Sequence, residues 1–117
     1  MYGEGGTRGR TAKLGIDATT NQACAVLYEK KQEVETDYVW YFLQKQYDKL
    51  RSLSHGSARH NFNAIDIKNF EIQIPSIEDQ KQIISQIEKL EAEINKAKET
   101  ISKVQERKKT VLDKYLL

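Results

Sequence analysis

The apolar positions of this chain follow one long, regular pattern near the C-terminus and shorter, mixed patterns before it. After Pro75 the sequence contains neither Gly nor Pro, and from Gln80 onward apolar residues recur with a seven-residue period. Eight of the eleven core positions of this heptad are Ile, Leu, Val or Ala, which is typical of a coiled coil. The pattern predicts one long helix over residues 76–117 that pairs with a partner helix.

The apolar stripe of this predicted helix is a candidate dimer interface. It comprises heptad core positions and two apolar neighbours, namely Ile83, Ile84, Ile87, Leu90, Ile94, Ala97, Ile101, Val104, Val111 and Leu112. The alternative is an amphipathic helix that packs on its own head. A helix of about 60 Å outreaches a head with a radius of gyration of about 11 Å, so we expect a homodimer.

The charges of the helix favour an antiparallel pair. Residues 76–96 hold five acids and three lysines, whereas residues 97–117 hold six bases and three acids. An antiparallel partner sets the acidic half against the basic half, and Ile84 then meets Leu112 if the pair is centred near residues 97–98. The same bias also complements the helix dipole, so charge by itself does not decide the direction.

The sequence before Pro75 mixes strand and helix patterns. Residues 22–29 form a small apolar run and residues 67–74 alternate apolar with polar positions, which predicts two strands. Between them, Thr36 is a candidate N-cap for an amphipathic helix that ends near Leu53. The expected fold class is therefore α+β.

A single proline marks the join between the head and the long helix. Pro75 ends the second predicted strand, Ser76 offers an N-cap, and Asp79 occupies the capping-box position three residues later. This join predicts two domains, a head over residues 1–75 and a dimerisation helix over residues 76–117.

Basic and amide side chains occur in two irregular stretches of the head. Residues 1–16 carry five of the six glycines, and residues 54–63 form a second loop. Side chains projecting from such stretches suit phosphate and base-edge contacts. The candidate DNA-binding residues are Arg8, Arg10, Lys13, Arg51, His55, Arg59, His60 and Asn61. The alternative is that these residues are ordinary loop charges, and that Arg59 and Asn61 only tie the loop to residues 67–74.

Other kinds of function find little support in the sequence. No nucleophile–base spacing or phosphate loop occurs, so we expect neither catalysis nor a cofactor. His55 and His60 lack the neighbouring Cys or acid that a metal site needs. The single cysteine, Cys24, suits a reducing cytoplasm, and no apolar run approaches a membrane span.

Four segments, in order and spacing, resemble one known family. They are Thr20–Gln22, the aromatic stretch 38–43, the run Gly56–Asn63, and the segment Ile74–Gln80 leading into the long helix. Over about residues 5–117 the chain resembles the C-terminal part of one repeat of the specificity subunit of type I restriction-modification systems. The segment around Pro75 is the most specific part of this resemblance.

The resemblance implies a non-catalytic subunit that recognises double-stranded DNA and docks methyltransferase subunits. Such subunits carry two recognition domains, each followed by a long helix, and the two helices pack antiparallel. This chain has one such helix and a shorter head, so we expect it to begin inside the recognition domain. It is then a natural half-subunit, a truncated product or a fragment. The competing hypothesis is an assembly module that binds partner subunits through its coiled coil without reading DNA.

Overall fold

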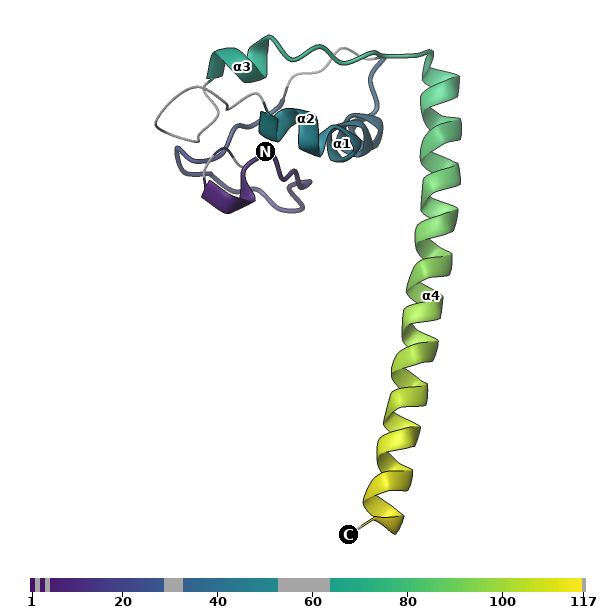
Figure 1. Cartoon of the computed structure of the whole chain (residues 1–117). Coiled ribbons are helices and arrows are strands. Elements are labelled where there is room, and N and C mark those ends of the chain that lie inside the picture. Colours follow the sequence, from purple (N-terminus) through teal and green to yellow (C-terminus); the bar gives the residue numbers. More distant parts are fainter. Residues whose placement is uncertain (2, 4, 29–32, 53–63, 117) are drawn as a thin grey trace. The chain divides into compact units, whose positions relative to one another are not determined.

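The computed structural model describes Met1, Gly3 and residues 5–28, 33–52 and 64–116. A short 3-10 turn, η1 (Gly5–Thr7), is followed by the helices α1 (Thr36–Lys45), α2 (Tyr47–Ser52), α3 (Ala64–Lys68) and α4 (Ile77–Tyr115) (Figure 1). The chain divides into two compact units, Met1–Lys81 and Gln82–Leu117. The first turn of α4 thus belongs to the first unit.

The described residues contain helices but no strand, so the expected α+β class is wrong. Among residues 22–28, the described part of the first predicted strand, only Cys24 takes part in a bridge. There the Gly3 N–H donates to the Ala23 carbonyl at 2.7 Å and the Ala25 N–H donates to the Met1 carbonyl at 2.8 Å. A strand needs a continuous ladder to a neighbour, and this pairing stops after a few residues.

The second predicted strand is also absent. Its first residues, Ile67 and Lys68, belong to α3, and residues 70–76 are irregular backbone without a ladder. Of the alternating apolar residues, Phe70 and Ile72 are half-buried whereas Ile74 is 41% exposed, so the alternation marks a segment with one side partly covered by the protein. Alternation reports burial, whereas a strand also requires a partner that the local sequence does not encode.

The predicted helix from Thr36 to Leu53 is divided into α1 and α2. Thr36 is the first helical residue rather than the N-cap, a position that Glu35 takes with extended backbone. Gln46 ends α1 with φ −88° and ψ 11°, and α2 begins at the next residue. Leu53 lies outside the described residues.

The first unit buries few large apolar side chains. Among the described residues, its buried apolar side chains are Ala23, Leu43 and Leu50, which are 6%, 5% and 1% exposed. The segments leading to and from Ala23 instead expose apolar side chains, namely Leu14, Ile16, Val26, Leu27 and Tyr28. Polar contacts described below therefore contribute much of what holds this unit together.

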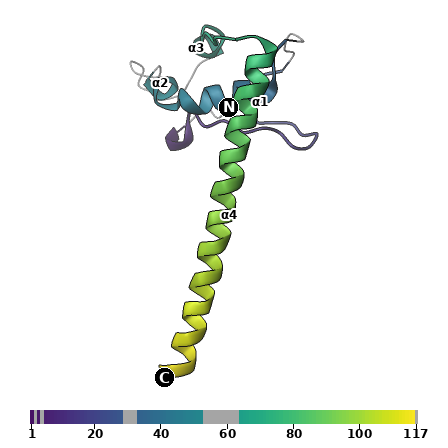
Figure 2. The same ribbon diagram turned by 90° about the vertical axis from the view of Figure 1, so that its right-hand side faces the viewer.

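The long helix begins with the predicted cap. The Asp79 N–H donates to the Ser76 hydroxyl at 3.2 Å, and that hydroxyl donates to an Asp79 carboxylate oxygen at 2.7 Å. From there α4 runs unbroken to Tyr115, as two perpendicular views show (Figures 1 and 2). Among the described residues, no helix combines the length and the apolar character needed to cross a membrane.

Candidate nucleic-acid interface and partner-binding helix

Two arginines converge on one tyrosine hydroxyl in the first unit. Arg51 donates through Nη1 to the Tyr47 hydroxyl and to the Gly6 carbonyl, each at 2.8 Å. Its guanidinium carbon lies 5.4 Å from the centre of the Tyr47 ring. Arg10 hydrogen bonds to the same hydroxyl. We call Arg10, Tyr47 and Arg51 the arginine–tyrosine cluster.

A glycine makes this cluster possible. Gly9 is buried and has φ +85°, a left-handed conformation that costs little only for Gly. A Cβ at this position would lie 3.4 Å from Arg51 Cγ and from two Tyr47 ring carbons. The N-terminal segment therefore approaches α2 closely, and η1 lies beside α2 in both views (Figures 1 and 2).

The electrostatics of the cluster favour negative charge at the tyrosine oxygen. Burial raises the pKa of the Tyr47 hydroxyl, but hydrogen bonds from Arg51 and Arg10 and their positive charges outweigh that effect and lower it. The same field stabilises any anionic oxygen placed there, and paired guanidiniums suit a phosphate. The cluster is therefore chemically suited to a nucleic-acid backbone.

Lys13 lies in a separate contact with α1. Its ammonium forms an ion pair with Asp37 and lies 4.7 Å from the centre of the Trp40 ring. The Trp40 indole N–H donates to the Thr11 carbonyl at 3.3 Å. These contacts fasten residues 11–13 to α1, so Lys13 already serves a structural purpose.

The structure places only some of the predicted DNA-binding residues. Arg10 and Arg51 meet at the arginine–tyrosine cluster, Arg8 is half-buried, and Lys13 is exposed against α1. The remaining candidates lie outside the described residues, namely His55, Arg59, His60 and Asn61. Sequence reasoning missed Tyr47, although its position four residues before Arg51 places both on one helix face.

The predicted interface residues form an exposed stripe on α4. Leu90, Ile94, Ile101, Val104 and Val111 are each between 51% and 59% exposed in the single chain. Ile83, Ala97 and Leu112 are also exposed, while Ile84 and Ile87 are half-buried. Exposed apolar residues at heptad spacing form a surface suited to another helix.

Gln80 departs from the heptad prediction. The pattern places it at the first core position of the stripe, but its side chain is fully buried within its own chain. Its amide makes three hydrogen bonds to backbone groups of residues 33, 35 and 75. The partner-facing stripe therefore begins after Gln80.

The chemistry of these residues is that of binding. Within the described part of the chain, no three His, Cys, Asp or Glu side chains gather as a metal site would require. An arginine pair on the head and an exposed apolar stripe along a helix are features of a protein that binds macromolecules.

Comparison with known families identifies the class of macromolecule-binding protein to which this chain belongs. The model of the type I restriction modification DNA specificity domain matches residues 1–105. This match covers most of the chain, so the protein belongs to that family, and the resemblance carried by the segment around Pro75 is confirmed. No solved structure matches the chain.

Proposed function

We propose that this chain is a non-catalytic DNA-recognition half-subunit of a type I restriction-modification system. Two copies associate through α4, and each head, residues 1–75, contacts double-stranded DNA. Methyltransferase subunits then dock on the dimer. The observation that carries this proposal is the exposed apolar stripe of α4 in a chain of the specificity family.

Homodimerisation is supported by the charge distribution of α4. Its first half is acidic and its second half basic, so two antiparallel copies complement each other along their whole length. A parallel copy sets like charges side by side. A coiled coil of five heptads offers a long continuous apolar seam, which is the usual driving force for such pairs.

DNA binding is supported by the arginine–tyrosine cluster. Arg10 is exposed, and Arg51 is half-buried but presents its guanidinium at the same hydroxyl. A DNA phosphate that accepts hydrogen bonds from both arginines either replaces the Tyr47 hydroxyl as their partner or binds beside it. Residues 54–63 lie outside the described residues; there Asn61 or His60 is proposed to contact a base edge and Arg59 a phosphate, and His55 is a further candidate for DNA contact.

A second candidate function is an assembly module that binds partner subunits without reading DNA. Its support comes from two of the predicted DNA contacts. Arg51 bonds to the Gly6 carbonyl, and Lys13 pairs with Asp37. Both side chains thus hold the head together, which is what a purely structural role requires.

One experiment separates the two functions. Sedimentation of the pure chain gives its mass, and binding to random duplex DNA is measured at two salt concentrations. The first function gives a dimer whose DNA affinity falls with salt by a log–log slope of roughly 0.9 per phosphate contact. A dimer without salt-dependent DNA binding favours the assembly module, and a monomer at micromolar concentration contradicts both.

The proposal has two further parts, namely that the chain is not an enzyme and that it acts in a reducing cytoplasm. The pure chain transfers no methyl group and cleaves no DNA. Its single cysteine suits a reducing cytoplasm, where a lone thiol stays reduced. Catalysis that survives substitution of His55 and His60 would point to an active site elsewhere in the chain.

A further inference from the structure

A small pocket is formed by α2 and the end of α3, within the first unit. It has a volume of about 270 Å³. Its lining comes from five residues, namely Lys49, Asp66, Asn69, Phe70 and Glu71. The turn that ends α3 holds part of this lining in place. There the Asn69 N–H donates to the Ile65 carbonyl at 3.0 Å, and the next N–H donates to the Ile67 carbonyl at 3.2 Å. We call this the Phe70 pocket.

The aromatic ring of the Phe70 pocket already holds a cation. The Lys49 ammonium lies 5.4 Å from the centre of the Phe70 ring, within the range of a cation–π interaction. Lys49 is exposed, whereas Phe70 is half-buried. An exposed ammonium on a flexible stem is strongly hydrated, so it leaves the ring for water at little cost. The ring is therefore a cation site whose present occupant can exchange.

The rest of the lining favours a guanidinium over an ammonium. Asp66 is half-buried and Glu71 is exposed, so two carboxylates accompany the single ammonium of Lys49. A guanidinium is planar and weakly hydrated, stacks on aromatic rings, and presents several N–H donors that match carboxylates. The Asn69 amide oxygen is a further acceptor at the same pocket. An arginine side chain fits this combination.

The Phe70 pocket lies on the opposite side of α2 from the arginine–tyrosine cluster. Tyr47 and Arg51 face the N-terminal segment, where a Cβ on Gly9 would touch both. Lys49 is two residues from each, about 200° around the helix, and it reaches Phe70 instead. The excess negative charge of the pocket repels phosphates. A protein therefore suits this side of α2 better than a nucleic acid.

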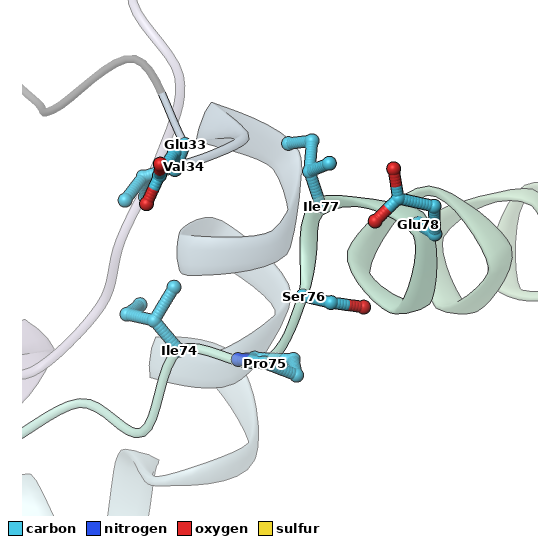
Figure 3. A pocket seen from close by; sticks show the side chains of 7 residues that line it. All are labelled: Glu33, Val34, Ile74, Pro75, Ser76, Ile77 and Glu78. Carbon is cyan, nitrogen blue, oxygen red and sulfur yellow. The ribbon is translucent and has the colours of Figure 1, made fainter.

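A larger groove of the first unit provides a comparison. This seam groove, at the first turn of α4, has a volume of about 520 Å³. Figure 3 shows Glu33 and Val34 on one side and the segment Ile74–Glu78 on the other. Glu33 and Glu78 are exposed acids, but the described residues that line this groove include no aromatic side chain. It offers a guanidinium charge without a ring, which makes it a matched control.

We propose that the Phe70 pocket binds an arginine side chain presented by a protein partner. The guanidinium stacks on the Phe70 ring and donates hydrogen bonds to the carboxylates of Asp66 and Glu71. Lys49 covers the ring in the single chain and moves into water when the arginine enters. This adds a protein-binding site on the head to the proposed function, and it depends neither on the homodimer nor on DNA binding.

A titration of the isotope-labelled chain tests the site by NMR spectroscopy. The probe is N-acetyl-arginine amide, which mimics an arginine within a polypeptide. The expected result is a saturable shift of the backbone signals of Asn69, Phe70 and Glu71. N-acetyl-citrulline amide has nearly the same shape without the positive charge and should cause no such shift. N-acetyl-lysine amide, with its side-chain ammonium, should bind more weakly than the arginine probe.

Two substitutions should weaken binding of the arginine probe. Phe70→Leu removes the ring and should weaken it by about four-fold. Glu71→Gln removes an exposed carboxylate and should weaken it by about three-fold. Glu78→Gln makes the same change in the seam groove and should leave the affinity unchanged. Because Glu71 is exposed, its variant keeps the test valid even if Phe70→Leu impairs folding.

Lys49→Gln should have the opposite effect. It removes the ammonium that competes for the ring, so binding of the arginine probe should tighten by about three-fold. Equal or weaker binding would show that Lys49 does not occupy the arginine site. Lys45→Gln alters an exposed lysine outside the pocket lining and should change nothing.

The outcomes separate this proposal from the proposed function. Saturable shifts with the arginine probe and none with the citrulline probe support the site. No shifts, or equal shifts with both probes, overturn it. Equally strong binding of the lysine probe overturns the assignment to arginine, and shifts of the same signals by duplex DNA overturn the protein partner. Glu71→Gln should keep the salt slope of DNA binding, so failure of this site leaves the DNA proposal intact.

Discussion

The side-chain amide of Gln80 holds the backbone of Glu35 across 45 residues of sequence. Gln80 Oε1 accepts a hydrogen bond from the Glu35 N–H at 2.9 Å. Its Nε2 donates to the Glu33 carbonyl at 2.8 Å and to the Pro75 carbonyl at 2.9 Å. The side chain is fully buried, so one residue in the first turn of α4 satisfies three backbone groups at the N-terminal end of α1 and at the seam.

Gln80→Leu should destabilise the first unit strongly. Leucine leaves the Glu35 N–H and the carbonyls of Glu33 and Pro75 without their partner. The three hydrogen bonds are part-buried, so water replaces part of what is lost and each group costs less than a fully buried one, for which the cost is about 1–3 kcal/mol. We expect a loss of about 2 kcal/mol and a melting temperature lower by roughly 10 °C. Thermal unfolding by circular dichroism measures both.

The exposed neighbour Gln82 provides the matched control for Gln80. Gln82→Leu makes the same chemical change at a solvent-facing position and should leave the melting temperature nearly unchanged. Equal effects of the two substitutions would contradict the role assigned to the Gln80 amide.

Arg51→Ala distinguishes a DNA contact from a structural bond. The substitution removes the hydrogen bonds to Gly6 and Tyr47, so we expect a loss of about 1 kcal/mol of stability. If Arg51 also contacts a phosphate, the salt slope of DNA binding falls by about one. The exposed Lys45→Ala serves as the control for loss of a surface charge. A lower melting temperature with an unchanged salt slope would favour the assembly module.

Tyr47 should ionise at lower pH in the folded protein than in the unfolded chain. Since Arg51 and Arg10 lower its pKa, its ionisation adds stability that is fully present above the ordinary tyrosine pKa of about 10. That stability is lost as the pH falls through the lower pKa of the folded state. Phenolate absorbance during alkaline titration should show one early component.

Tyr47→Phe identifies the source of that component. The substitution should remove the early absorbance step and leave the remaining tyrosines unchanged. Tyr28→Phe, at a side chain that is 77% exposed, is the control and should preserve the early step. An early step that survives in Tyr47→Phe would contradict the cluster.

Local signals in the sequence predicted the long helix well. Pro75, the Ser76 cap and the apolar heptad all act within a few residues of one another, and the structure contains the capped helix they specify. The predicted α+β fold class was wrong because strands depend on distant partners. The division at Gln46 was also missed, because no Gly or Pro marks it in the sequence.

The candidate site was predicted by residue type but not by geometry. Arg10 and Arg51 were chosen because they are basic, yet nothing in their spacing of 41 residues indicates that they meet at Tyr47. Gln80 was read as part of the heptad because its position fits the period. Only the three backbone groups around it reveal that it faces its own head.

Trp40 provides an optical readout of Lys13. Trp40 is the single tryptophan of the chain, and the Lys13 ammonium lies 4.7 Å from its ring centre. Lys13→Ala should therefore change the emission of Trp40. If DNA draws Lys13 onto a phosphate, addition of duplex to the native chain changes the emission in the same direction. A Lys13→Ala chain should then show no such change, and an equal response in both would contradict a DNA contact by Lys13.

Ile94→Asp should separate the dimer. Ile94 lies in the middle of the apolar stripe and is 51% exposed in the single chain, so a partner helix would bury the new carboxylate without a counter-charge. We expect a cost of about 3 kcal/mol or more, which weakens association by at least about 100-fold. Asn95→Asp adds the same charge one residue along, outside the core positions of the heptad, and should leave the dimer intact. Sedimentation at several concentrations measures both, and equal association of the two variants would show that the stripe is not the interface.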